Sequence, residues 1–149
     1  MTDVSFYHLQ RRSLEETLPK LLERVMAASQ RALVLAESED RVEALSNRLW
    51  VYEPGSFLAH GTGRDRYPDQ QPIYLTSTEE NPNGAGILVL VDERLPAFLA
   101  SFDRCLDLFD GNDPQSVQNA RDRWRACKAA GHAVTYWQQD EDGRWQKKA

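Results

Sequence analysis

The amino-acid sequence predicts an α/β fold in three layers: a doubly wound, mostly parallel sheet with helices on both faces. Short apolar runs of strand length alternate along the chain with segments whose apolar residues recur at helical spacing. The segments 31–36 and 87–91 contain continuous apolar stretches, which are typical of parallel strands covered on both faces. Turn-forming residues separate the runs, as at Asn81-Pro82-Asn83-Gly84.

Two strand–helix units make up the first third of the chain. Residues 4–9 are predicted to form a strand, followed by a helix over about 18–29 with Pro19 near its start. Residues 31–36 form the second strand, and Ser38 caps the helix after it. The apolar faces of these helices contain Leu18, Leu21, Leu22, Val25 and Met26 in the first, and Val42, Leu45 and Leu49 in the second.

A long loop is predicted over 51–71, where prolines, glycines and isolated aromatic residues leave room for at most one short element. Strands follow at 73–76 and 87–91, and the second of these is expected near the centre of the sheet. A short helix at 96–102 precedes a further strand at 105–109.

The last two predicted strands lie on either side of a long helix. Asp107 stands inside the strand at 105–109, so we expect this strand not to be buried on both faces. The final strand covers 133–138, and a turn at 140–143 follows it.

The helix over 113–130 has the clearest boundaries in the sequence. Asp113 or its neighbour Asn112 can cap its first turn, and Pro114 suits the first helical position. Gly131 follows as a residue that readily adopts the left-handed conformation at a helix end.

This helix places two ridges side by side. The apolar ridge contains Val117, Ala120, Trp124 and Cys127, and the basic ridge contains Arg121, Arg125 and Lys128. Trp124 lies at their boundary, which suits capture of an acidic peptide that ends in an aromatic residue. The alternative is a solvated basic face with Trp124 in the core, because charged residues at helical spacing are most often solvated.

Composition and length limit the possible functions. A chain of 149 residues with 41% hydrophobic residues predicts one domain over 1–149 with a substantial core. A net charge of -5 opposes strong direct binding to nucleic acid, which depends on phosphate neutralisation. The sequence has neither an apolar run long enough for a membrane span nor a signal-peptide pattern at its start, so we expect a cytoplasmic protein without membrane contact.

Phosphate-binding motifs are absent from the sequence. There is no Gly-x-x-x-x-Gly-Lys-Ser/Thr loop, and the turn after the first strand, at 8–12, contains no glycine. Gly61-Thr62-Gly63-Arg64 resembles half of a dinucleotide motif, but it follows a helix instead of a strand and is interpreted as a flexible loop. The prediction is therefore a Rossmann-like fold without a nucleotide site and without a cofactor.

No metal or catalytic site is predicted either. Cys105 and Cys127 have no second cysteine or histidine at metal-binding spacing, and both are expected to be small core residues. No Gly-x-Ser-x-Gly motif occurs, and no acid–base pair stands out among the carboxylates. The histidines His8, His60 and His132 are expected to be structural or solvated.

Several short runs resemble one protein family when taken together. They are Phe6-Tyr7-His8-Leu9, Ala36-Glu37-Ser38-Glu39, Leu49-Trp50, Ser56-Phe57-Leu58-Ala59-His60, Ile87-Leu88-Val89-Leu90, and Ala120-Arg121-Asp122-Arg123-Trp124-Arg125 before Lys128-Ala129-Ala130-Gly131. In this order, over nearly the whole chain, they resemble the chi subunit of bacterial DNA polymerase III. The resemblance implies a non-catalytic clamp-loader accessory subunit that links the replicase to single-stranded DNA-binding protein by binding its acidic C-terminal tail.

The same resemblance implies roles for residues of the long helix. Arg121 would pair with the terminal carboxylate of the tail, Trp124 would form part of the wall around the terminal phenylalanine ring, and Lys128 would lie one turn further on. Val117 stands where some relatives have a basic residue, so the tail would depend more on Arg125.

A second interface is implied with the small psi subunit. Where that subunit is absent, the same surface would contact the clamp loader differently or be buried. The matching residues are Trp50, Phe57 and His60, which could equally fold back over the sheet edge.

Two other functions stay open. One is a nucleotide-binding enzyme with its site at the strand ends; the other is a domain that binds single-stranded nucleic acid through Arg64, Arg66 and Tyr67 or through 144–148.

Overall fold

The computed structural model describes residues 1–10, 12–51, 60–63 and 67–149. In this part of the chain the strands are β1 (Asp3–Leu9), β2 (Ala32–Leu35), β3 (Gly61–Thr62), β4 (Ile73–Thr76), β5 (Ile87–Leu90), β6 (Arg104–Asp110), β7 (Ala133–Gln139) and β8 (Trp145–Lys147). The helices are α1 (Leu14–Ala27), α2 (Glu39–Val51) and α3 (Pro114–Ala129), with short 3-10 helices η1 (Pro68–Gln70) and η2 (Ala97–Ser101).

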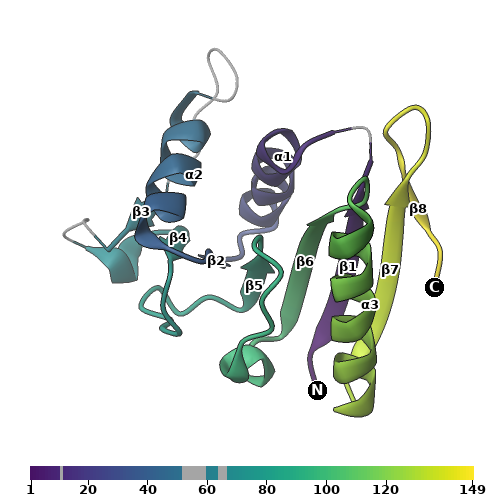
Figure 1. The fold of residues 1–149 in the computed structure, drawn as a ribbon. Coiled ribbons are helices and arrows are strands. Elements are labelled where there is room, and N and C mark those ends of the chain that lie inside the picture. Colours follow the sequence, from purple (N-terminus) through teal and green to yellow (C-terminus); the bar gives the residue numbers. More distant parts are fainter. Residues whose placement is uncertain (11, 52–59, 64–66) are drawn as a thin grey trace.

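All of these strands belong to one sheet, in the order β3-β4-β2-β5-β6-β1-β7-β8 (Figure 1). Every neighbouring pair is parallel except β7 with β8, which is antiparallel. β5 lies between β2 and β6, as predicted for the run at 87–91. The predicted mostly parallel α/β fold is confirmed.

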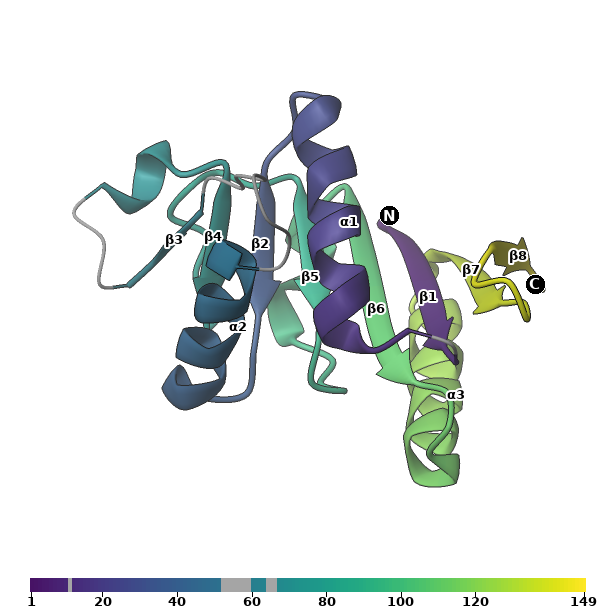
Figure 2. The ribbon, with the colours of Figure 1, turned by 90° about the horizontal axis from the view of Figure 1, so that it is seen from above.

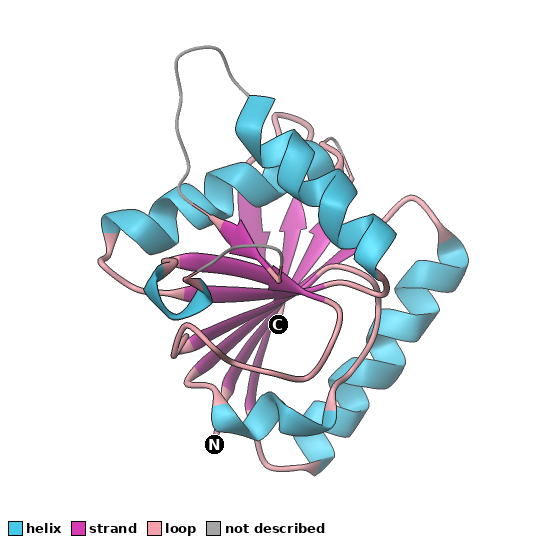
Figure 3. Cartoon of the chain, turned by 90° about the vertical axis from the view of Figure 1, so that its left-hand side faces the viewer, coloured by secondary structure: helices cyan, strands magenta, loops and turns pink. Residues whose placement is uncertain are grey.

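Helices cover both faces of the sheet, which gives three layers (Figures 2 and 3). The core on one face joins α1 and α2 to the sheet, with Leu22 and Leu45 fully buried. The core on the other face joins α3 and η2 to the sheet through residues such as Phe6 and Ala120. Burial of each large apolar side chain stabilises the fold by about 1.5–3 kcal/mol.

Both cysteines are core residues, as predicted. Cys105 and Cys127 are buried in the α3-side core. Burial raises the pKa of Cys127 to about 11, so its thiol stays protonated at neutral pH.

Helix α1 begins earlier than predicted, at Leu14 instead of about residue 18. The Ser13 hydroxyl accepts a hydrogen bond from the Glu16 amide at 3.3 Å, which caps the helix, and it lies 3.2 Å from the Glu16 carboxylate, to which it donates. Pro19 therefore lies inside the helix and not near its start. The prediction was wrong because it used Pro19 as the start signal and overlooked Ser13.

Strand β6 also differs from its prediction. Its five inner residues are all buried, and Asp107 has an exposed fraction of 0%. The strand can contain a carboxylate there because Arg123 on α3 donates two hydrogen bonds to it, from Nε at 2.7 Å and Nη2 at 2.9 Å. A buried ion pair replaces the predicted exposure to solvent.

Short elements interrupt the segment that was predicted to be a long loop. β3 pairs in parallel with β4, so Gly61 and Thr62 extend the sheet instead of forming a flexible loop, and η1 follows them. β8 was not predicted at all, whereas the short helix near 96–102 is confirmed as η2. Within the described residues, no helix has both the length and the apolar character that a membrane span requires.

Candidate functional site

Helix α3 is held at both ends as its sequence predicts. The Asp113 carboxylate accepts a hydrogen bond from the Gln115 amide at 3.0 Å, and Pro114 occupies the first turn. Gly131, with φ of +87°, ends the helix in the left-handed region. The ends of the helix, and hence the positions of its side chains along the sheet, are well defined.

The two predicted ridges are neighbours on the surface of α3. Its buried side chains are Ser116, Ala120, Arg123 and Cys127, which face the sheet. Arg121, Arg125 and Lys128 are exposed on the neighbouring strip of the helix, as predicted. Val117 and Trp124 are partly buried at the boundary and pack against the α3-side core.

Arg123 is the residue of α3 that sequence reasoning missed. Its side chain is 7% exposed, and it is paired with the fully buried Asp107 of β6. The pKa of Asp107 is raised above its ordinary value, because burial raises it more than the hydrogen bonds and charge of Arg123 lower it. The sequence contains a usable signal, because Arg123 is in helical phase with Ala120 and Cys127 and so faces the sheet.

The ion pair fixes the rotation of α3 about its axis. Arg123 points toward the sheet, and the helical geometry then turns Arg121 and Arg125 outward. Removing one partner of such a buried pair typically costs about 3–5 kcal/mol, because the other charge is left without compensation. Asp107 and Arg123 thus support the basic ridge without being part of it.

A shallow concavity of about 570 Å³ lies on the outer side of α3. It is lined by Arg121, Trp124, Arg125, Lys128 and Ala129. Four of the five residues predicted for peptide binding therefore come together, and Val117 instead packs against the core.

The Trp124 ring is held by aromatic neighbours beneath it. Its ring centroid lies 5.7 Å from that of Phe6 on β1 and 6.0 Å from that of Tyr136 on β7. On its outer side, Lys128 Nζ lies 6.0 Å from the ring centroid, within the range of a cation–π contact. Trp124 therefore provides a fixed apolar surface with a cation above it.

The cations around Trp124 remain open to solvent. Arg125 contacts Asp122 at 3.5 Å, but their side chains are 71% and 62% exposed. Exposed pairs of this kind contribute at most about 1 kcal/mol, so Arg125 can exchange this partner for a ligand carboxylate at little cost. The concavity thus combines an apolar surface with exchangeable cations.

His8 of β1 is held by polar partners on β7 and just after β6. The Gly111 carbonyl, which can only accept, lies 3.2 Å from His8 Nε2, so Nε2 carries the hydrogen and Nδ1 accepts from the Tyr136 hydroxyl. Burial lowers the pKa of His8, the Gly111 carbonyl raises it, and the charge of Arg121 lowers it. His8 is therefore a structural histidine, as predicted.

The second predicted surface lies at the end of α2. Trp50 is 50% exposed, and its ring centroid lies 4.3 Å from that of His60. His60 is buried, and its Nε2 is 3.0 Å from the Ser46 hydroxyl. Trp50 and His60 thus lie together, whereas Phe57 is outside the described residues.

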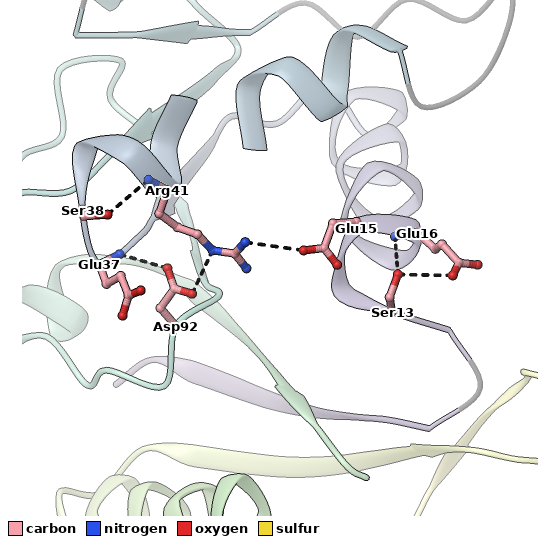
Figure 4. Close-up of polar contacts among 7 residues, drawn as sticks. All are labelled: Ser13, Glu15, Glu16, Glu37, Ser38, Arg41 and Asp92. Carbon is pink, nitrogen blue, oxygen red and sulfur yellow. Dashed lines mark hydrogen bonds and ion pairs between the residues drawn. The ribbon is translucent and has the colours of Figure 1, made fainter. Parts of the chain in front are cut away.

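A larger cleft, of about 730 Å³, lies at the carboxyl ends of β1 and β6 and beside the first turns of α1 and α2. Arg41 crosses it, with Nε 3.1 Å from the Asp92 carboxylate and Nη1 3.4 Å from that of Glu15 (Figure 4). Asp92 also accepts a hydrogen bond from the Glu37 amide at 2.9 Å. Nucleotide-binding sites of doubly wound folds lie in this position.

The protein's own side chains already pair with the helix ends and with Arg41 in this cleft. Ser13 and Ser38 cap α1 and α2, and acidic residues outnumber basic ones along its walls. The acidic residues are Glu15, Glu16, Glu37, Asp92, Glu93 and Asp110, and the basic ones are Arg12 and Arg41. This charge distribution disfavours a phosphate group.

Among the described residues, no group of three or more histidine, cysteine, aspartate or glutamate side chains could hold a metal ion.

Comparison with known families identifies the relatives of this chain. The family model described as "DNA polymerase III chi subunit, HolC" matches residues 1–135. The chain belongs to this family. The sequence resemblance that the short runs suggested is thereby confirmed.

Two named relatives support the same family. "Probable DNA polymerase III subunit chi" of Rickettsia prowazekii is 31% identical over 91 residues, or 61% of this chain and 55% of that protein. DNA polymerase III subunit chi of Haemophilus influenzae is 23% identical over 120 residues, or 80% of this chain and 83% of that protein. The match with the Rickettsia protein thus spans little more than half of its length.

Proposed function

We propose that this protein is a non-catalytic accessory subunit of the clamp-loader complex of DNA polymerase III, which binds the acidic C-terminal tail of single-stranded DNA-binding protein. It would act as one domain in the cytoplasm. The observation that best supports this function is the concavity on α3, where three exposed cations surround a Trp124 ring that is fixed from below. Membership of the chi-subunit family supports the link to the replicase.

The chemistry of the concavity matches a chain that ends in phenylalanine. A guanidinium group can bind a carboxylate through two parallel hydrogen bonds, so Arg121 would receive the terminal carboxylate. The phenylalanine ring would lie against Trp124, beside the cation of Lys128. Arg125 and Lys128 would contact acidic side chains further up the tail, and Val117 would contribute only through the core on which Trp124 rests.

Affinity would come from several modest contacts. A hydrogen bond to a charged group contributes about 1.5–3 kcal/mol, and exposed ion pairs contribute less. Arg121, Arg125 and Lys128 are all exposed, so their contribution would weaken as salt increases.

A second contact would use the end of α2. Trp50 is half exposed beside the buried His60, and aromatic side chains that protrude in this way are typical anchors of protein interfaces. We propose that Trp50, His60 and Phe57 contact the psi subunit where it is present and connect the protein to the clamp loader.

Titration calorimetry with a synthetic acidic peptide that ends in Pro-Phe tests the proposed function. The same peptide without its final phenylalanine is the control. Binding that requires the final residue is expected, because both the ring and the position of the carboxylate depend on it. Equal binding of the two peptides, or no binding of either, would contradict the proposal.

A further inference from the structure

One face of the sheet is left without a helix at β1, β7 and β8. Figure 2 shows α1 and α2 over the other part of the sheet, with β7 and β8 extending beyond α1. α3 covers the opposite face at this position, where Phe6 and Tyr136 contact Trp124. On this face Ser5, Tyr7, Thr135 and Trp137 are only partly buried, whereas Leu9 and Gln139 at the ends of the strands are buried.

Aromatic side chains gather on this open face. Tyr7 and Trp137 are partners in the β1–β7 register, and their rings are nearly parallel, with centroids 6.5 Å apart and an interplanar angle of 12°. Trp145 of β8 meets Tyr7 edge-on at 5.0 Å, and both side chains pack against the core beneath α1. Ser5 and Thr135, whose hydroxyls are 3.0 Å apart, continue the face along the strands.

Cations border these rings. Lys147 is the partner of Trp137 in the β7–β8 register and so lies on the same face. Burial raises the pKa of Tyr7, and the charges of Arg104 and Arg24 lower it in part. The acidic side chain on the same face of β1 is Asp3, which is the register partner of Arg104.

We propose that this face, with Trp137 as the stacking surface and Lys147 and Arg104 as phosphate contacts, binds single-stranded nucleic acid. Every unpaired base has a flat face that can stack on an aromatic ring, and a phosphate follows each base along the chain. The face supplies both kinds of contact within a few strands. A duplex would hide its bases inside the helix and would leave Trp137 without a stacking partner.

This inference is independent of the proposed function. The tail-binding concavity is on α3, on one side of the sheet, and the aromatic face is on the other side. Single-stranded nucleic acid and an acidic peptide should therefore bind at the same time. The overall charge of -5 predicts that nucleic-acid binding is weak and is favoured at low salt.

Fluorescence anisotropy of the full chain with a labelled oligothymidylate on the order of a dozen nucleotides long tests the proposal at low salt. Trp137→Ala is expected to weaken binding on the order of tenfold or more, since it removes the stacking surface. Trp50→Ala is the matched control, because it removes an exposed tryptophan from a different part of the molecule and should leave affinity unchanged. Trp145 is not suitable, since it packs against the core.

A second variant keeps the test decisive if Trp137→Ala disturbs the fold. Lys147→Glu changes an exposed side chain, so it should preserve folding, weaken oligonucleotide binding and reduce the slope of log affinity against log salt by about one. Arg121→Ala should keep oligonucleotide affinity even if it loses the tail peptide. The proposal is overturned if duplex DNA binds as well as the single strand, if Lys147→Glu binds unchanged, or if the acidic peptide displaces the oligonucleotide.

Discussion

The cleft at the strand ends and the concavity on α3 differ in whether their charged side chains are already paired within the protein. In the cleft, Arg41 is already paired with Asp92 and Glu15, and the first turns of α1 and α2 are capped by Ser13 and Ser38. On α3, the charged groups of the basic ridge are exposed and its apolar surface is partly uncovered. Binding capacity depends on groups whose partners can be exchanged, so the smaller concavity is the better candidate site.

In this protein the α/β sheet supports a site on α3, away from the crevice at the carboxyl ends of its strands. The sheet supports the Trp124 ring through Phe6 and Tyr136. The Asp107–Arg123 pair fixes the orientation of α3 about its own axis. The candidate site is therefore rigid underneath and solvated above, which limits the entropy that the protein itself loses when it binds a peptide.

The largest expected effect comes from breaking the support of the α3 concavity. Asp107→Ala leaves the Arg123 charge buried and unpaired, so the free energy of unfolding should fall by about 3–5 kcal/mol. Urea unfolding measures this loss. Asp122→Ala, which removes an exposed carboxylate from the same helix, is the control and should change stability by no more than about 1 kcal/mol. A loss as small as that of the control would show that the pair does not anchor α3.

Trp124→Ala is expected to lower stability by less than Asp107→Ala and also to weaken peptide binding. The ring packs against the α3-side core and also lines the concavity, so truncation should cost about 2–3 kcal/mol of stability and also weaken tail binding. Thermal melting and peptide calorimetry on the same samples separate the two losses. Full peptide affinity in a folded Trp124→Ala variant would remove this ring from the proposed site.

A third variant tests the cleft by itself. Arg41→Ala removes the side chain that joins Asp92 to Glu15, whose side chains are 12% and 42% exposed, so stability should fall by about 1 kcal/mol. Peptide affinity should not change, because Arg41 is not part of the α3 concavity. Chemical unfolding and calorimetry check both points, and a loss of peptide affinity would place the site at the cleft.

A fourth prediction concerns pH and His8 of β1. The pKa of His8 is lowered in the folded protein, so below pH 6.5 the unfolded chain binds a proton that the folded chain does not. Stability should therefore fall as pH decreases below about 6.5, by at most about 1.4 kcal/mol per pH unit from this residue. Urea unfolding of wild type and His8→Gln at several pH values measures this contribution to the free energy of unfolding. His132→Gln is the control. Identical slopes for wild type and His8→Gln would contradict it.

Elements with a strong local pattern could be predicted from the sequence. The strands at β2 and β5 follow from continuous apolar runs, and α3 follows from its cap, its periodicity and Gly131. The exposed positions of Arg121, Arg125 and Lys128 follow from the same periodicity. These properties depend on residues that are close together in the chain.

The remaining features depend on contacts between distant residues. β8 is a three-residue strand that exists because it pairs with β7, and short strands of this kind have little local signal. The Asp107–Arg123 pair joins residues 16 positions apart, so Asp107 alone was interpreted as a sign of exposure. The grouping of Tyr7, Trp137 and Trp145 on one face also requires the strand register.

The most direct test of the α3 site is calorimetry of the acidic Pro-Phe peptide with wild type, Arg121→Ala and Arg41→Ala. These variants remove the same kind of side chain from the concavity and from the cleft. We predict that Arg121→Ala weakens binding on the order of tenfold or more, with an unchanged melting temperature, and that Arg41→Ala binds like wild type. Unchanged affinity in Arg121→Ala, or loss in Arg41→Ala alone, would contradict the assignment of tail binding to α3.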